Sequence, residues 1–370
     1  MTCKGIIKYF EEWAPKEIAW QKDNVGLQIG SINQKLTNIL LCLDLTDQVI
    51  DDAIKKNCNL IISHHPLLFH PLKKIDLQND RNSKLIEKLI KNDITLYSAH
   101  TNLDFTKDGV SFELAKKLKL NKIDFLVHQN SKQYKLIVFV PENFVDKVSN
   151  AIFENGGGQI GEYTNCSFRA KGNGTFKGSK NTNPFLGEKN TSATIEEIKL
   201  EVLVDSWKLK KILAAIFEVH PYEEVAYDVC LLANSNLKYG AGAIGELDKQ
   251  MYQSQFLDYV SKNLKIKNFR YSKGNYRIKK VALCGGAGGD LLNDAINSGA
   301  DAFITADLKY HGFQDANEKI LLIDAGHYET EIHSLDEVKR KLNNYIIDKN
   351  ISTKIFKYDG STNPIFFYNK

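Results

Sequence analysis

The chain has 370 residues, of which 43% are hydrophobic and 25% charged, and its formal charge is +4. This composition is typical of a globular protein with room for two or three domains, and it excludes a disordered chain. The longest apolar runs are far shorter than the ~20 residues that cross a bilayer, so we expect no membrane partner. The lysines are scattered along the chain, which predicts a solvated surface rather than a nucleic-acid-binding face.

The N-terminal segment, residues 1–13, has helical spacing of apolar residues with acids between them. This pattern is unlike a signal or transit peptide, and it predicts a cytoplasmic protein. The six cysteines form no CxxC pair, and several lie inside apolar runs. We therefore expect reduced thiols and no thiolate zinc site.

Residues 39–63 resemble residues 281–305. A shift of 242 positions aligns them without a gap, with the same order of apolar positions and with Leu41-Cys42 on Leu283-Cys284. Each segment predicts a strand, a helix and a second strand, which is a β-α-β unit. We therefore predict an α/β fold with two related α/β lobes, residues 1–126 and 239–370, that flank a metal cleft.

The segment between the repeats, residues 127–238, has a different pattern. It predicts two β-α-β halves, with strands at 135–140, 198–204 and 225–232, helices at 142–155 and 209–219, and short β segments in the glycine-rich stretch up to residue 187. Such halves indicate a ferredoxin-like α+β module. Because both copies of the repeat lie outside it, we predict an inserted domain.

Two distant segments have the residue types of one metal site. His64-His65 and residues 99–104 follow apolar runs in the first half, and residues 324–331 follow one near the C-terminus. Side chains at strand ends can point into a cleft. His327 and Glu331 are four residues apart at the start of a predicted helix, which suits a ligand and a bridging carboxylate. So many imidazoles and carboxylates exceed the need of one tetrahedral ion and favour two ions that share a carboxylate.

Each of these motifs also has a structural interpretation. A His-His pair is often a polar strand end, and His/Glu pairs four residues apart are common on solvated helices. Adjacent histidines in extended backbone also diverge, so His64 and His65 would serve two neighbouring ions. It is the joint occurrence of the motifs that favours a metal site.

Three further motifs leave alternatives open. Residues 240–245 match GxGxxG, but a polar stretch precedes them, so a glycine-bearing strand is favoured over a dinucleotide site. Residues 284–290 follow a predicted strand, and their glycines allow either anion binding or tight packing. Residues 220–224, His-Pro-Tyr-Glu-Glu, end a predicted helix, and their polar side chains could face a ligand.

Taken together, these motifs resemble the Nif-three-like family, whose bacterial members carry the name GTP cyclohydrolase 1 type 2 homolog. The similarity covers nearly the whole chain. It rests on residues 23–30, 63–69, 98–104, 220–226, 284–288 and 323–331.

The resemblance implies a dinuclear metal centre, a ring-shaped homohexamer and an insert similar to trimeric signalling and copper-tolerance proteins. It places the metal ligands on His64, His65, Asp104, His327 and Glu331, with Glu331 as the bridge. His100 then becomes a residue that supports a ligand or takes part in catalysis. One departure is Ala306, where the family usually has Gly, and it concerns the backbone of that turn alone.

The first functional hypothesis is a metal-dependent hydrolase, similar to GTP cyclohydrolase 1 type 2, that acts on a nucleotide or a related phosphorylated small molecule. Two divalent ions per chain would be its cofactors. Nitrogen and oxygen ligands suit zinc, with iron or manganese as alternatives. The second hypothesis is a metal-binding scaffold or metal-handling protein without turnover. A ring that encircles nucleic acid is disfavoured because the basic residues are not concentrated.

Overall fold

The computed structural model describes residues 1–130, 132–274 and 276–368. The chain is a mixed α/β protein with several sheets. It divides into two compact units, residues 1–128 with 239–370 and residues 129–238. Within the described ranges, none of the helices is long and apolar enough to cross a membrane.

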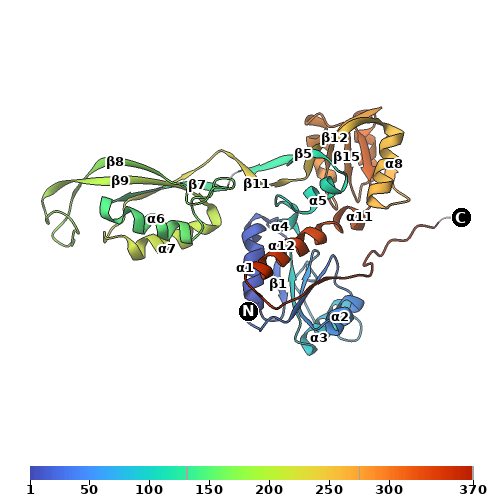
Figure 1. Ribbon diagram of the computed structural model, residues 1–370, viewed down its shortest axis with the longest axis horizontal. Helices are drawn as coiled ribbons and strands as arrows, with labels where there is room; N and C mark the ends of the chain where they lie inside the picture. The colour runs from blue at the N-terminus through green and yellow to red at the C-terminus, as the bar shows by residue number, and fades with distance from the viewer. Residues whose placement is uncertain (131, 275, 369–370) are drawn as a thin grey trace. The chain divides into compact units, whose positions relative to one another are not determined.

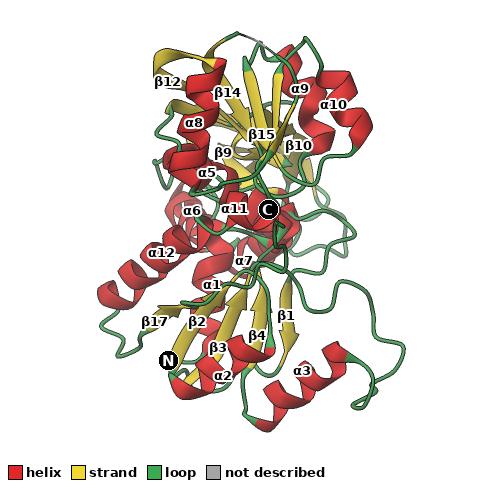
Figure 2. Ribbon diagram, turned by 90° about the vertical axis from the view of Figure 1, so that its right-hand side faces the viewer, coloured by secondary structure: helices red, strands yellow, loops and turns green. Residues whose placement is uncertain are grey.

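The first unit contains a five-stranded sheet in the order β1-β4-β3-β2-β17, seen in the lower part of Figure 2. Helices α1 and α12 pack on one face, and α2 and α3 pack on the other. Alternation along a strand produces the two faces, because Ile39 and Leu41 contact one layer and Leu40 and Cys42 the other. The bounds are β1 (Gly26–Ile29), β2 (Asn38–Cys42), β3 (Cys58–Ser63), β4 (Thr95–Ser98), β17 (Ile355–Lys357), α1 (Cys3–Trp13), α2 (Asp47–Lys55), α3 (Arg81–Lys91) and α12 (Ser334–Asp348).

The same unit contains a six-stranded sheet in the order β13-β16-β15-β14-β12-β5. Helices α5 and α8 cover one face, and α9 and α10 cover the other. Strands β14, β15 and β16 are parallel to one another. The bounds are β5 (Asn121–Asp124), β12 (Ala243–Tyr252), β13 (Arg270–Tyr271), β14 (Arg277–Leu283), β15 (Ala302–Thr305), β16 (Leu321–Asp324), α5 (Val110–Lys117), α8 (Gln253–Leu264), α9 (Leu292–Asn297) and α10 (Tyr310–Ala316).

The two repeat segments form β-α-β units with the same strand register. Leu41 pairs with Ile62 in the parallel ladder of β2 and β3, and Leu283 pairs with Ile304 in that of β14 and β15. Both residues of the second pair lie 242 positions after those of the first, which is the shift that aligns the two sequences. The predicted β-α-β unit is therefore present at both places.

The two sheets exchange segments of the chain. Strand β5, which precedes residue 126, belongs to the six-stranded sheet (Figure 1), whereas β17 and helix α12 from the C-terminal part belong with the five-stranded sheet (Figure 2). Helix α5 likewise packs its apolar residues Phe112, Leu114 and Ala115 against the six-stranded sheet. Neither sheet is therefore built from one continuous part of the chain.

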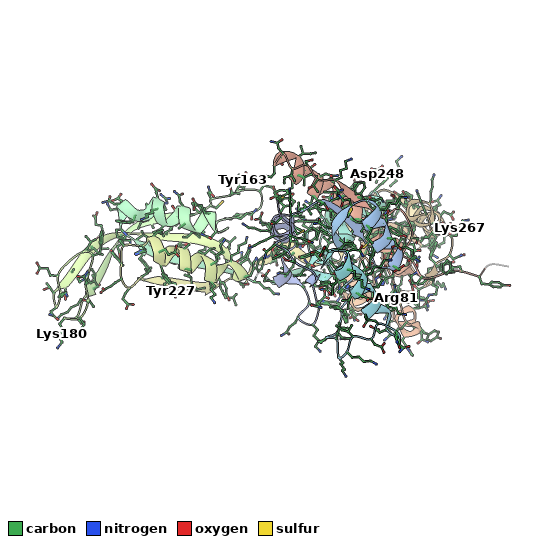
Figure 3. All side chains as sticks on the ribbon, turned by 90° about the horizontal axis from the view of Figure 1, so that it is seen from below. Arg81, Tyr163, Lys180, Tyr227, Asp248 and Lys267 are labelled. Atoms are coloured by element: carbon green, nitrogen blue, oxygen red, sulfur yellow. The ribbon has the colours of Figure 1, made fainter. Side chains whose placement is uncertain are left out.

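The second unit has the element order β-α-β-β-α-β. Its four-stranded antiparallel sheet runs in the order β10-β7-β9-β8, and its core consists of residues of this unit. The three strands and two helices predicted here are confirmed; Lys180 marks the loop between β8 and β9 (Figure 3). The bounds are β7 (Gln133–Val140), α6 (Val145–Glu154), β8 (Phe168–Lys177), β9 (Ser192–Asp205), α7 (Leu209–Val219) and β10 (Tyr227–Leu231).

A two-stranded sheet of β6 (Val127–Asn130) and β11 (Ser235–Ala241) contains both points where the chain passes between the units. The GxGxxG segment, residues 240–245, lies in β11 and β12 with Gly242 between them at a φ of +61°. The prediction of a glycine-bearing strand at this place is confirmed.

The separation of the cores predicts that the first unit folds without the second. In a variant with residues 129–238 replaced by a short Gly/Ser linker, we expect a cooperative thermal transition. Its Tm should lie within about 4 °C of the corresponding transition of the intact chain, a shift equivalent to roughly 1 kcal/mol. Calorimetry measures both transitions. A variant that fails to unfold cooperatively would show that the second unit contributes to the first unit's core.

Candidate metal centre

The side chains of the predicted site follow the carboxyl ends of parallel strands. His64 and His65 follow β3, and their backbone N–H groups donate to the carbonyl groups of Cys42, the last residue of β2, and of Leu43, the residue after it. His100 follows β4 and precedes helix α4 (Thr101–Asp104), while Gly326, with a φ of +89°, leads from β16 into α11 (His327–Glu331). Strand ends of both sheets of the first unit thus contribute to one cluster, the usual place for a ligand in α/β folds.

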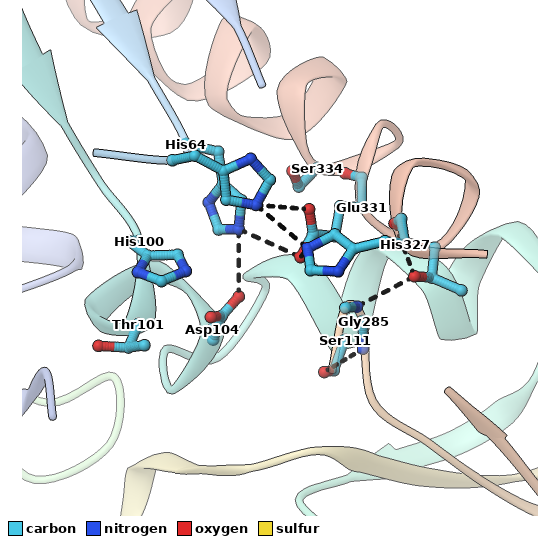
Figure 4. Close-up of polar contacts among 12 residues, drawn as sticks. His64, His100, Thr101, Asp104, Ser111, Gly285, His327, Glu331 and Ser334 are labelled. Carbon is cyan, nitrogen blue, oxygen red and sulfur yellow. Dashed lines mark hydrogen bonds and ion pairs between the residues drawn. The ribbon is translucent and has the colours of Figure 1, made fainter. Parts of the chain in front are cut away.

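The carboxylate of Glu331 lies at the centre of the cluster (Figure 4). Its Oε1 is 3.0 Å from His327 Nε2 and 3.6 Å from His64 Nε2, and its Oε2 is 3.1 Å from His65 Nε2. The fifth expected ligand, Asp104, has Oδ1 3.6 Å from His64 Nε2. The structure therefore brings together all five residues that the family resemblance implies as ligands.

The side chains of His64 and His65 diverge less than they would in an extended backbone. The chain bends at these two residues, and the ring centroids of His64 and His65 are 4.9 Å apart. Their Nε2 atoms nevertheless approach different oxygens of Glu331. The contacts form two groups that share this carboxylate, His64 with Asp104 and His65 with His327.

His100 also belongs to the cluster. Its ring centroid lies 5.3 Å from that of His64 and 5.5 Å from that of His65. One nitrogen from each of His64, His65 and His100 lies within 4.8 Å of the others, as do ligand atoms of His65, His327 and Glu331. His100 is therefore close enough to be a ligand or to exchange a proton with a molecule bound there.

An acceptor holds the Nδ1 atom of each of the four imidazoles. Histidines that bind metals characteristically donate their second N–H to a carboxylate or carbonyl, which fixes the ring and leaves the other nitrogen for the ion. The pairs are His64 with Ala99 O at 2.8 Å, His65 with Asp44 at 2.8 Å, His100 with Asp23 at 3.0 Å and His327 with Asp307 at 2.7 Å.

Sequence reasoning did not assign these supporting carboxylates. Asp23 appeared only within a segment of family resemblance, and Asp44 had no motif of its own. Asp307 could have been found, because the repeat aligns it with His65. It occupies the equivalent strand end and supports His327 there.

The charges of the cluster are mutually compensated. Burial alone would raise the pKa of Glu331, but the imidazoles of His64, His327 and His65 hold it well below its usual range. Burial would lower the pKa of His65, whereas Asp44 and Glu331 raise it to about 10. For His327, burial is likewise outweighed by Glu331 and Asp307, which raise the pKa to about 9. Without an ion, protons therefore balance the buried carboxylate.

The atoms at the centre fit a cation. Among the described residues, His64 Nε2, Asp104 Oδ1 and Glu331 Oε2 are buried without a hydrogen-bond partner. Unsatisfied buried polar atoms cost free energy and are rare unless they have a function. His65 Nε2 and His327 Nε2 also lie 3.2 Å apart, and two such nitrogens need a proton or cation between them. The nitrogen and oxygen donors suit zinc, iron or manganese.

The glycine-rich segment after β14 packs tightly against the cluster. Gly286 has a φ of +65°, and a Cβ at this position would overlap Glu331 Oε1. Its N–H bonds to Thr330 Oγ1 at 3.0 Å. Of the two interpretations of residues 284–290, the contacts support close packing.

The C-terminal segment, residues 361–367, contacts Asp44, which holds His65, and Glu329 of α11. Thr362 Oγ1 donates to Asp44 at 3.0 Å, and Asn363 Nδ2 donates to Glu329 at 2.8 Å. Residues of this segment line a cavity of about 560 Å³ that reaches His327 and a cavity of about 230 Å³ that reaches His65. A small molecule could therefore reach the cluster beside this segment.

Comparison with known proteins identifies the family. The family described as Duf34/NIF3 (NGG1p interacting factor 3) matches residues 1–364. A protein of Halalkalibacterium halodurans named GTP cyclohydrolase 1 type 2 homolog is 39% identical over 98% of this chain and 98% of its own length. Its namesake in Bacillus subtilis is 37% identical over 98% and 97%.

Solved structures agree with the sequence matches. A Bacillus cereus protein related to NIF3 has a TM-score of 0.86 at 36% identity, and the match covers 100% of this chain and 99% of that one. The Staphylococcus aureus protein SA1388 has a TM-score of 0.79 at 30% identity with the same coverage. The chain therefore belongs to the Duf34/NIF3 family.

Proposed function

We propose that this protein holds two divalent metal ions and is a metal-dependent hydrolase that acts on a nucleotide or a related phosphorylated small molecule. The proposed ligands are His64, His65, Asp104, His327 and Glu331, with Glu331 as the bridge. The observation that carries the proposal is the convergence of Nε2 atoms and carboxylate oxygens, with every Nδ1 atom already held by an acceptor.

Two ions are favoured over one because the contacts form two groups around Glu331. His64 and Asp104 lie on one side, and His65 and His327 on the other. Zinc is the first metal to test, and iron or manganese would suit the same donors.

When bound, such ions would lower the pKa of water and polarise the bond under attack. The chain's own contribution is proton transfer and orientation. His100 donates its Nδ1 proton to Asp23, which leaves Nε2 free to accept a proton on the side of the cluster. Burial would raise the pKa of Asp23, but hydrogen bonds from His100 and Thr101 lower it to about 2, so it stays a charged acceptor. The proposed catalytic residue is therefore His100, with Asp23 as its positioning residue.

The relatives' name suggests GTP cyclohydrolase chemistry, in which water attacks the imidazole carbon of guanine. The name of the relatives is what supports a guanine nucleotide as the substrate. The chemistry of the cluster suits other phosphorylated ring compounds equally. A scaffold that binds metal without turnover is the alternative that the His100 experiment below separates.

We also propose that the two mixed sheets of the first unit are the cores of two related lobes, residues 1–126 and 239–370 apart from the exchanged elements β5, β17 and α12, and that residues 127–238 are an inserted ferredoxin-like domain. The common register of β2–β3 and β14–β15 supports the first statement, and the β-α-β-β-α-β order supports the second. The family resemblance supports a homohexameric ring, and light scattering of the purified protein tests the number of subunits.

Replacing Glu331 by Gln should remove the bridge. We expect both ions to bind more weakly, because the amide has no charge to neutralise them. Loss of a residue that supports a ligand costs roughly 10–100-fold in metal affinity, and loss of the bridge should cost more. Metal analysis after equilibrium dialysis measures this. The matched control is Glu329→Gln, two residues away on α11, which should keep both ions. Full occupancy in Glu331→Gln would contradict the ligand assignment.

Replacing Gly286 by Ala should displace Glu331 as well as strain the backbone. The control is Gly299→Ala, because Gly299 also has a positive φ but no described atom lies within 4 Å of a Cβ there. We expect both variants to lose about 1 kcal/mol of unfolding free energy. Only Gly286→Ala should also lose metal affinity, as measured by competition with a chelator. Equal metal affinities would show that close packing at Gly286 does not position the carboxylate.

Replacing His100 by Ala should separate an enzyme from a scaffold. We expect metal content to remain while turnover of a nucleotide-panel substrate falls by roughly 100-fold or more, because a general acid or base is lost. His70→Ala, an exposed histidine, is the control. If His100→Ala removes metal as completely as His65→Ala, His100 is a ligand. If the metal-loaded wild type turns over no member of the panel, the scaffold hypothesis replaces the hydrolase.

A further inference from the structure

The second unit contains a cavity of about 250 Å³ beside the His220–Glu224 segment. Its wall includes the aromatic rings of Phe176, Phe185 and Tyr222 and the carboxylates of Glu197, Glu223 and Glu224. All its lining residues belong to residues 129–238, so the cavity is complete within one unit. Its size is below the ~300 Å³ at which pockets for drug-sized ligands begin, and it suits a smaller molecule.

The His220–Glu224 segment builds this cavity. His220 is buried, its Nε2 lies 3.1 Å from Phe139 O, and its Nδ1 accepts the N–H of Tyr222 at 3.2 Å. Pro221 then ends the helical path of α7, so the chain turns and Tyr222 reaches the cavity wall. Glu223 accepts the N–H of Asn183 at 2.8 Å, which ties the β8–β9 loop to the turn. His220 is thus a structural residue that positions its neighbours.

The hydroxyl group of Tyr222 is buried without a hydrogen-bond partner among the described residues. Burial and the nearby Glu197 carboxylate raise the pKa of Tyr222, so the hydroxyl keeps its proton. A buried polar group without a partner costs roughly 1–3 kcal/mol, a cost that a bound molecule can remove. The hydroxyl therefore marks a place for a polar atom of a ligand.

The three carboxylates have no lysine, arginine or histidine partner in the described parts of the chain. Glu196, which precedes Glu197 on β9, differs in this respect because it pairs with Lys171 at 2.9 Å. Glu197 follows Glu196 directly, so its side chain lies on the opposite face of β9. Of these two adjacent carboxylates, the one on the cavity side therefore lacks a cationic partner.

The arrangement does not suit an inorganic ion. Among the described residues, the clusters of side chains that lie close enough together to share a metal ion are in the first unit. Glu197, Glu223 and Glu224 do not form such a cluster. Carboxylates that are spread around aromatic rings instead suit a cation with an apolar body. The rings of Phe185 and Tyr222 pack against each other, with centroids 6.3 Å apart at 47°, and form an aromatic wall against which an apolar group with an attached ammonium ion can lie.

We propose that this cavity is a binding site for a small organic cation, an amine or guanidinium compound with an aromatic or apolar body. Glu197 and Glu224 attract the charge, Tyr222 hydrogen-bonds to the ligand's polar group, and Phe176 and Phe185 contact its body. The proposal is independent of the hydrolase function, because its residues lie in the other unit.

Titration of the intact protein with benzylamine, phenethylamine and benzylguanidine tests the site, with benzyl alcohol as the neutral counterpart of benzylamine. Saturation-transfer NMR and calorimetry measure the affinities. We expect saturable binding of at least one cation, and at least roughly tenfold weaker binding of the alcohol. Tyr222→Phe and Glu197→Gln should each weaken binding of the cation by roughly tenfold.

Glu196→Gln is the matched control, because it removes a carboxylate from the same strand on the opposite face and should leave binding unchanged. Should Glu197→Gln fail to fold, Glu224→Gln tests the charge in its place. The proposal is overturned if none of the three cations binds below about 10 mM. It is equally overturned if benzyl alcohol binds as well as benzylamine, or if Glu196→Gln weakens binding as much as the cavity variants.

Discussion

The buried carboxylate of Glu331 is the constraint on which the rest of the site depends. An ionised carboxylate in a protein interior is costly unless positive partners surround it. Here three imidazoles supply those partners, and each of them is held in turn by an acceptor on its other ring nitrogen. The positions of Asp44 and Asp307 and the absence of a side chain at Gly286 follow from this need to surround one carboxylate.

The repeated β-α-β unit explains how one chain provides these partners from two sheets. His65 and Asp307 occupy equivalent strand ends, yet one contacts Glu331 and the other holds His327. The common strand register of the two β-α-β units thus places two polar side chains at matching positions. The sequence of each copy then decides which of them faces the centre and which supports it.

Much of this site could be predicted from the sequence, because strand ends and helical spacing are local features. His64, His65, His327 and Glu331 all follow apolar runs that periodicity identifies. The supporting contacts of Asp23 and Asp44 could not be predicted, since they join residues 77 and 21 positions apart. The exchange of β5 and β17 between the sheets could not be predicted either. Packing against a distant core, and not local propensity, decides which sheet a short strand joins.

The balance of charge also bears on how metal binding relates to folding. In small zinc domains the metal supplies the folding energy, because no site exists before the ion binds. Here the cores of both sheets are extensive, and raised pKa values of His65 and His327 provide protons that neutralise Glu331 without an ion. We therefore expect the apolar cores rather than an ion to stabilise this fold, and we expect ions that enter the site at neutral pH to displace protons.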